Sequence, residues 1–242
     1  MKHATFVFIW SFAVLLASSL ACAQEITFTA RVTWADDAKA NLHHSVEGVV
    51  VWLAPADNTQ IAEPSAPKND HFVLSQKGKT FQPHTLVVPV GGVVEFPNRD
   101  PFFHNVFSLF EGKRFDLGLY EAGTSREVHF NRPGISYIFC NIHPEMSAVV
   151  IAIPASYYAT SDALGQIVIP HVSAGRYLLH FWYEGAQPDE LDAMTREVTI
   201  SERISTAGIL RLKPPGTLLP HKNKYGREYD PSTSDKPGYE HP

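Results

Sequence analysis

Residues 71–153 consist largely of short apolar segments separated by turn-forming residues, and this pattern restricts them to β structure. The segments are rich in Val, Ile and Phe, which favour strands, and Gly, Pro, Asn and Asp stand between them. Short strands with frequent turns are typical of a sandwich or a barrel. The segments that we expect to be strands are residues 72–75, 85–90, 93–97, 104–109, 126–130, 135–140 and 147–153.

The chain on either side of this region has the same character. Ile26 to Trp34 alternates apolar with polar residues, which predicts a half-buried strand. The continuous apolar run in residues 46–55 instead predicts a strand that is buried on both faces. Strand and turn signals resume over residues 157–213, with one helical turn expected at 188–193. We therefore predict an all-β fold.

Three side chains that bind soft metal ions lie on one predicted loop. Cys140, His143 and Met146 have the spacing C-x2-H-x2-M, between the expected strands at 135–140 and 147–153. A second imidazole would complete a His₂Cys site with a weak axial Met, a ligand set that suits copper. His104, upstream of the loop, is the candidate for that ligand. Zinc also binds Cys and His, but a thioether is a poor zinc ligand.

Other interpretations of these residues are less specific. A Cys and a His can form the nucleophile and base of a hydrolase, but Met146 has no role in such chemistry. A buried, inert cysteine is the default for a lone Cys140 without neighbouring ligands. Asp100 and Glu145 flank the site, and the default expectation for each is a solvated turn residue.

The N-terminus indicates export. Residues 1–23 combine a short basic start, an apolar run and a small-residue cleavage site, which together predict a signal peptide and a periplasmic protein. A retained membrane anchor, or a lipid attached at Cys22, is the alternative. Cleavage would leave Cys140 as the one cysteine, and a metal ion is the simplest occupant of a lone thiol in an oxidising compartment.

Charge argues against nucleic-acid binding, and hydropathy argues against a membrane span in the mature chain. The formal net charge is −5 and no basic stripe is present, which argues against nucleic-acid binding. After signal cleavage, no other apolar run approaches the length of a membrane span.

Residues 71–153 resemble a small cupredoxin. The loop from Cys140 to Met146, with Pro144 directly after the histidine, is similar to the copper loop of amicyanin, and residues 86–108 resemble the strands that carry the first histidine ligand in amicyanin and plastocyanin. The resemblance implies a Greek-key β-sandwich with one type 1 copper ion. It implies His104, Cys140, His143 and Met146 as ligands. It also implies that the Asn105 side chain pins the Cys140 loop while a backbone N–H bonds the sulfur.

The flanking segments resemble a different module. Residues 161–177, SDALGQIVIPHVSAGRY, are similar to a motif of carboxypeptidase regulatory-like sandwich domains. The layout resembles bacterial exported proteins of the methylamine-utilisation type, in which a cupredoxin is inserted into such a sandwich. We therefore predict a signal peptide at 1–23, a smaller sandwich split between 24–60 and 155–213, a cupredoxin domain at 69–153, and a disordered tail at 214–242.

These features together predict an exported blue copper protein that carries single electrons. Its partners would be redox proteins such as a c-type cytochrome or a periplasmic oxidoreductase. Four filled ligand positions leave no open site for a substrate, so an enzyme is not expected. Two alternatives stay open, namely a periplasmic protein that stores or delivers copper, and a metal-free β-sandwich that serves as a binding module.

Overall fold

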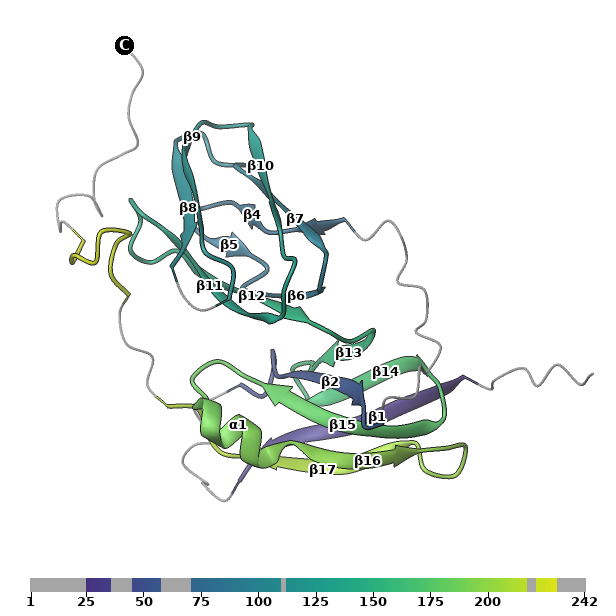
Figure 1. The fold of residues 1–242 in the computed structure, drawn as a ribbon. Coiled ribbons are helices and arrows are strands. Elements are labelled where there is room, and N and C mark those ends of the chain that lie inside the picture. Colours follow the sequence, from purple (N-terminus) through teal and green to yellow (C-terminus); the bar gives the residue numbers. More distant parts are fainter. Residues whose placement is uncertain (1–24, 36–44, 58–70, 110–111, 217–220, 230–242) are drawn as a thin grey trace, which may run out of the picture.

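The computed structural model describes residues 25–35, 45–57, 71–109, 112–216 and 221–229. The predicted signal peptide, with Cys22, lies outside these ranges. The described chain contains 17 strands and one helix, arranged as two sandwiches that stack on each other (Figure 1). The prediction of an all-β fold with two sandwiches is confirmed. The helix, α1 (Pro188–Met194), falls where a helical turn was expected, and no described helix is long and apolar enough to cross a membrane.

The first sandwich is formed by residues 71–153. A five-stranded sheet faces a three-stranded sheet, and a small hairpin closes one edge. Phe96, Val106, Phe130 and Ile138 fill the core between the sheets and are at most 1% exposed. The larger sheet has the order β6 (Thr85–Pro89), β12 (Ser147–Ile153), β11 (Gly134–Cys140), β8 (His104–Ser108) and β9 (Phe115–Tyr120); the smaller has the order β10 (Ser125–His129), β7 (Val93–Pro97) and β3 (Phe72–Val73); and the hairpin is β4 (Ser75–Gln76) with β5 (Phe81–Gln82).

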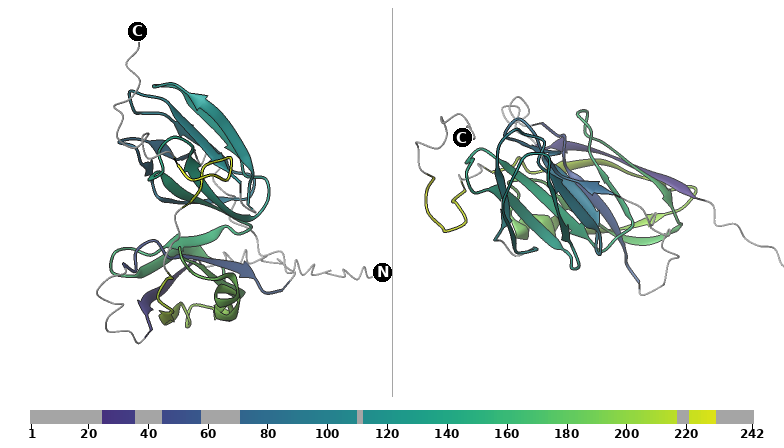
Figure 2. Two further views of the ribbon diagram at one scale, coloured as in Figure 1. Left: turned by 90° about the vertical axis from the view of Figure 1, so that its left-hand side faces the viewer. Right: turned by 90° about the horizontal axis from the view of Figure 1, so that it is seen from above.

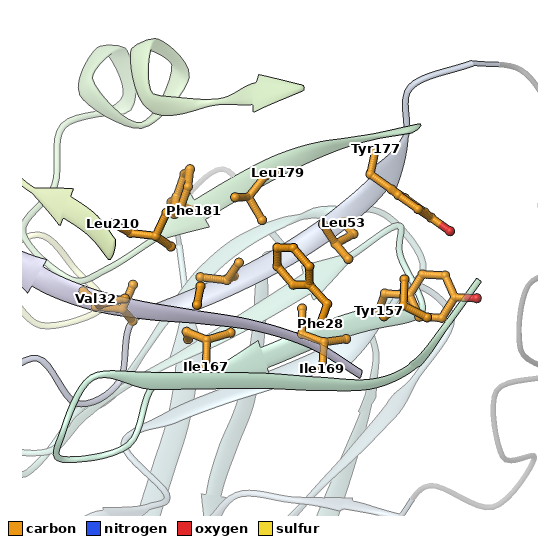
Figure 3. Close-up of a cluster of buried hydrophobic side chains, with 14 of the residues drawn as sticks. Phe28, Val32, Leu53, Tyr157, Ile167, Ile169, Tyr177, Leu179, Phe181 and Leu210 are labelled. Carbon is orange, nitrogen blue, oxygen red and sulfur yellow. The ribbon is translucent and has the colours of Figure 1, made fainter. Parts of the chain in front are cut away.

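The second sandwich joins two segments that are far apart in the sequence. Its strands before residue 56 pair with strands after residue 156: β1 is antiparallel to β14 and parallel to β17, and β2 lies between β13 and β15. Phe28, Leu53 and Ile167 meet in the core between its two sheets (Figure 3). The sheets have the orders β14 (Gln166–Val172), β1 (Ile26–Trp34), β17 (Thr206–Leu212), and β13 (Tyr157–Thr160), β2 (Val50–Pro55), β15 (Gly175–Trp182), β16 (Arg196–Ile200).

A third apolar cluster joins the two sandwiches. Val149 and Ile151 of β12 pack toward Val50 of β2 and Trp182 of β15, all at most 2% exposed. Alternate residues of β12 point into the core of the first sandwich, so this strand is buried on both faces. The strand β2 is likewise buried on both faces, as its continuous apolar run predicted.

A polar contact crosses the same junction. His84, just before β6, places Nε2 2.8 Å from a carboxylate oxygen of Glu184, which follows β15. Its Nδ1 lies 3.2 Å from the backbone carbonyl of Ser147. The hydrogen bond to Glu184 raises the pKa of His84 above its usual value of 6.5, although partial burial opposes this effect.

Part of the tail that the sequence predicts to be disordered makes defined contacts with the first sandwich. Residues 221–229 form a turn whose side chains and backbone bond to the end of β11 and to β9. Polar composition predicted disorder here, but a Lys, a Tyr and a His of this segment find specific partners on the first sandwich. Residues 230–242 lie outside the described ranges.

Burial decides the expected effect of mutations in the second sandwich. Ile167 on β14 is fully buried, whereas Ile209 on β17, two strands away in the same sheet, is 52% exposed. We expect Ile167→Ala to lower the free energy of unfolding by about 2–5 kcal/mol because it leaves a cavity. Ile209→Ala should change it by less than about 0.5 kcal/mol. Urea denaturation of both variants tests this, and equal effects would contradict the packing described.

The pair across the junction should make stability depend on pH. Because the folded-state pKa of His84 is raised, its contribution is fully present below pH 6.5 and is lost as pH rises through that raised value. Glu184→Gln should therefore reduce the free energy of unfolding at pH 5.5 by roughly 0.2–1 kcal/mol and have no such effect at pH 9. Glu127→Gln, exposed on β10, is the control. A pH-independent loss would argue against the pair.

Candidate metal centre

Neighbouring strands bring the predicted ligands together. His104 begins β8 and Cys140 ends β11, and these two strands pair antiparallel. The loop after Cys140 is closed by two backbone hydrogen bonds: Met146 N–H donates to the His143 carbonyl at 3.1 Å, and Cys140 N–H donates to the Met146 carbonyl at 3.3 Å. The loop carrying His143 is therefore fixed at both ends by the sheet.

Three donor atoms converge on one point. The Nδ1 atoms of His104 and His143 lie 3.1 Å apart, and each lies within 3.7 Å of the Cys140 sulfur. For metal–nitrogen and metal–sulfur bonds of about 2.0 and 2.3 Å, three ligands spread around one ion would be separated by roughly 3.5 Å. The three residues therefore fit a trigonal site for one ion and form a candidate metal site.

Burial keeps both imidazoles neutral. It lowers the pKa of His143 to about 4, with a further contribution from the nearby His104. The pKa of His104 is also lowered, first by burial, although Asp100 opposes that effect. Neutral rings at neutral pH leave nitrogen lone pairs free to bind a metal.

The Cys140 sulfur is prepared for negative charge. Burial raises the pKa of the thiol, while the backbone N–H groups of Asn105, Ile142 and His143 hydrogen bond to the sulfur and oppose that rise. Three N–H donors directed at a buried sulfur favour a thiolate once a cation is present. The arrangement therefore suits a metal-bound thiolate better than a free thiol.

Asp100 is not the solvated turn residue that the sequence suggested. It is only 7% exposed, and its carboxylate accepts a 2.9 Å hydrogen bond from His104 Nε2. It also accepts the N–H groups of Gly78 and Lys79, at 2.6 and 3.0 Å. Although burial raises its pKa, these hydrogen bonds lower it overall. Because Nε2 holds the proton, the lone pair of His104 is on Nδ1, which faces the sulfur.

Asn105 differs in part from the role that the resemblance implied. Its backbone N–H hydrogen bonds to the Cys140 sulfur. Its side chain instead donates from Nδ2 to Asp116 at 2.7 Å, and Oδ1 is buried with no hydrogen-bond partner. The side chain thus links the site to β9 rather than to the Cys140 loop.

The site reaches the surface through one ligand. His143 is 8% exposed, whereas His104, Cys140 and Met146 are fully buried. The Phe102 ring lies against both histidine rings, with centroid separations of 5.3 and 5.7 Å. Met146 belongs to the same apolar core as Cys140, and its role as a ligand stays a prediction.

Comparisons with known proteins find that about a third of the chain is similar to cupredoxins of known structure. No protein-family model matches the sequence, and no curated protein matches it. A purple cupredoxin from Nitrosopumilus maritimus is 23% identical over 34% of this chain and 99% of its own, with a TM-score of 0.31. A reduced Cu(I) form of an amicyanin variant is 20% identical over 35% of this chain and 84% of its own, with a TM-score of 0.33.

A copper-containing nitrite reductase from Thermus scotoductus SA-01 is also similar. It is 26% identical over 34% of this chain, with a TM-score of 0.33, and the match spans 22% of that enzyme. The resemblance of the second sandwich to carboxypeptidase regulatory-like domains stays a prediction.

Removing the Asp100 carboxylate tests how His104 is held. Asp100→Asn keeps the size of the side chain but weakens the hydrogen bond that fixes the His104 tautomer. We expect copper affinity, measured by competition with a chelator, to fall about 10–100-fold. Asp189→Asn on the exposed surface of α1 is the control. An affinity equal to that of the control would show that Asp100 does not orient the ligand.

Proposed function

We propose that this chain is an exported type 1 copper protein that carries single electrons between redox proteins. The convergence of two imidazole nitrogens and one cysteine sulfur in a buried pocket carries this proposal. Hydrolytic zinc sites keep a position open for water and seldom use a thioether, whereas this donor set mixes soft and intermediate ligands without an added carboxylate. His104, Cys140 and His143 would hold the ion, with Met146 at a long axial position.

A copper ion in this site would supply a one-electron couple. The protein residues would keep the ligands in place while the charge changes. Cys140 and His104 lie on paired strands, and the two backbone hydrogen bonds of the loop restrict His143 and Met146. Full burial of three of the four side chains excludes water. A site that rearranges little between two oxidation states favours fast electron transfer.

Electrons would enter and leave through His143. It is the one ligand side chain with measurable exposed surface, 8%, and Phe102 lies at its edge. Lys79 and Glu145 act on His143 with opposite electrostatic effects, so the charge near this surface is mixed. We therefore infer that a partner such as a c-type cytochrome or a periplasmic oxidoreductase docks here with only modest dependence on salt.

Export and the absence of enzymatic activity belong to the same proposal. Cys140 is free and buried, and it is the one cysteine in the described residues. A lone thiol suits an oxidising compartment when a metal occupies it. The signal sequence at 1–23 would direct the chain to the periplasm, with lipid attachment at Cys22 as the variant of this route. The ligand set leaves no position for a substrate.

The decisive experiment is a spectrum of the Cu(II)-loaded protein and its variants. The wild type should show an intense visible band from the Cys140 thiolate, and Cys140→Ser should abolish it without unfolding the chain. Met146→Leu should keep the band and raise the reduction potential, because the weak axial ligand tunes it. A band that persists in Cys140→Ser would rule out this site.

Copper exchange separates an electron carrier from a delivery protein. A carrier should be oxidised and reduced reversibly by a soluble cytochrome in stopped-flow mixing and keep its copper against a mild chelator. Slow or irreversible oxidation with rapid copper loss would assign the same ligands to storage or delivery.

A further inference from the structure

Residues 221–229 contact three consecutive residues at the metal end of β11. The His221 ring stacks on Phe139, with centroids 4.0 Å apart and planes 22° apart. The Tyr229 hydroxyl donates to the Cys140 carbonyl at 2.8 Å, and Lys224 N–H donates to the Asn141 side chain at 3.0 Å. Figures 1 and 2 show this segment, in yellow, beside the first sandwich. The segment therefore holds the residue that supplies the thiol together with both of its neighbours.

The segment is itself an organised turn. The Asn223 side-chain oxygen accepts the N–H groups of Tyr225 and Arg227, at 3.0 and 3.1 Å. Gly226 has a φ of 74°, a conformation that glycine adopts without strain. His221 and Tyr229 close the turn, with Nδ1 of His221 3.2 Å from the Tyr229 hydroxyl. Its contacts with β11 are thus made by a shaped element and not by an extended chain.

A chain of polar contacts runs from this segment to the sulfur. The Lys224 ammonium group donates to Asp116 of β9 at 2.8 Å, and the other oxygen of Asp116 accepts the Asn105 side chain at 2.7 Å. The backbone N–H of Asn105 bonds the Cys140 sulfur. Asn105 is 2% exposed, whereas the Lys224 and Asp116 side chains are 21% and 40% exposed, so water screens the outer contact more than the inner one.

We propose that residues 221–229 form a C-terminal brace, in which Lys224 and Tyr229 position the Cys140 thiolate and its Asn105 N–H donor. Tyr229 fixes the Cys140 backbone directly, and Lys224 acts through Asp116 and Asn105. Hydrogen bonds to a metal-bound thiolate and exclusion of water around it tune the reduction potential of a copper site. The inference deepens the proposed copper function and rests on it for the effect on potential, whereas the effect on the thiol does not require the metal.

Two conservative variants test the brace, each with a matched control outside its contacts with β11 and β9. Lys224→Met removes the charge that bonds Asp116, and Lys222→Met makes the same change at a side chain that is 61% exposed and lies 3.8 Å from Glu228. Tyr229→Phe removes the hydroxyl that bonds the Cys140 carbonyl, and Tyr183→Phe removes one that bonds the Lys213 carbonyl at 2.8 Å, beside the second sandwich. Denaturation midpoints measured for all four variants show whether each remains folded.

The first readout uses the metal-free protein. Alkylation by iodoacetamide is followed at the Cys140 peptide by mass spectrometry, so that Cys22 does not interfere. A single lost hydrogen bond changes a local opening equilibrium about fivefold, so Lys224→Met and Tyr229→Phe should each speed alkylation of the buried thiol by about that factor. The two controls should match the wild type. Equal rates in all five proteins would overturn the brace.

The second readout uses the copper-loaded protein. A weaker N–H bond to the thiolate leaves more charge on sulfur and favours the oxidised ion. The equilibrium with a one-electron mediator should therefore shift about tenfold toward oxidised protein, or about 59 mV, in Lys224→Met and Tyr229→Phe. An unchanged potential and unchanged visible band would show that the segment has a structural role alone. Failure of every protein to bind copper would refute the proposed function, while the alkylation rates would still decide whether the segment holds the thiol.

Discussion

Burial of β12 on both of its faces is the interaction on which the rest of the structure depends. Ala148 and Val150 and their alternating neighbours pack into the first sandwich, and Val149 and Ile151 pack against β2 and β15. Each fully buried Val or Ile side chain of this strand contributes about 1.5–3 kcal/mol. Because β12 begins directly after Met146, the same packing that joins the sandwiches also holds one end of the metal loop. The position of His143 therefore depends on a core that lies outside the metal site.

The central part of the site could be predicted from sequence because it is local. Cys140, His143 and Met146 share one short loop, and strand pairing of β8 with β11 is sufficient to bring His104 to them. Asp100 could not be assigned, because its burial depends on the N–H groups of Gly78 and Lys79 in a distant turn. A sequence pattern gives the residue type and the spacing of apolar residues. It does not show which distant turn will cover a given side chain.

The same limit explains the elements that the pattern missed. The strand β9 mixes exposed and half-buried residues and contains Gly118 at a φ of 70°, so neither alternation nor composition indicates a strand. Residues 221–229 have the polar composition of a free tail, and their order comes from partners on β11 and β9. By contrast, β1 and β2 could be predicted from the sequence because each buries whole faces in apolar cores.

The split of the second sandwich also bears on the order in which the two sandwiches fold during synthesis. Its strand β1 emerges first during synthesis, yet its partners β14 and β17 lie more than a hundred residues later in the chain. The strands of the first sandwich pair only with one another, within residues 71–153, so the loops that this pairing closes are shorter and less costly in entropy. We therefore expect the first sandwich, with its metal loop, to fold while β1 and β2 are still unpaired. Once folded, the first sandwich would bring the two segments of the second sandwich close together.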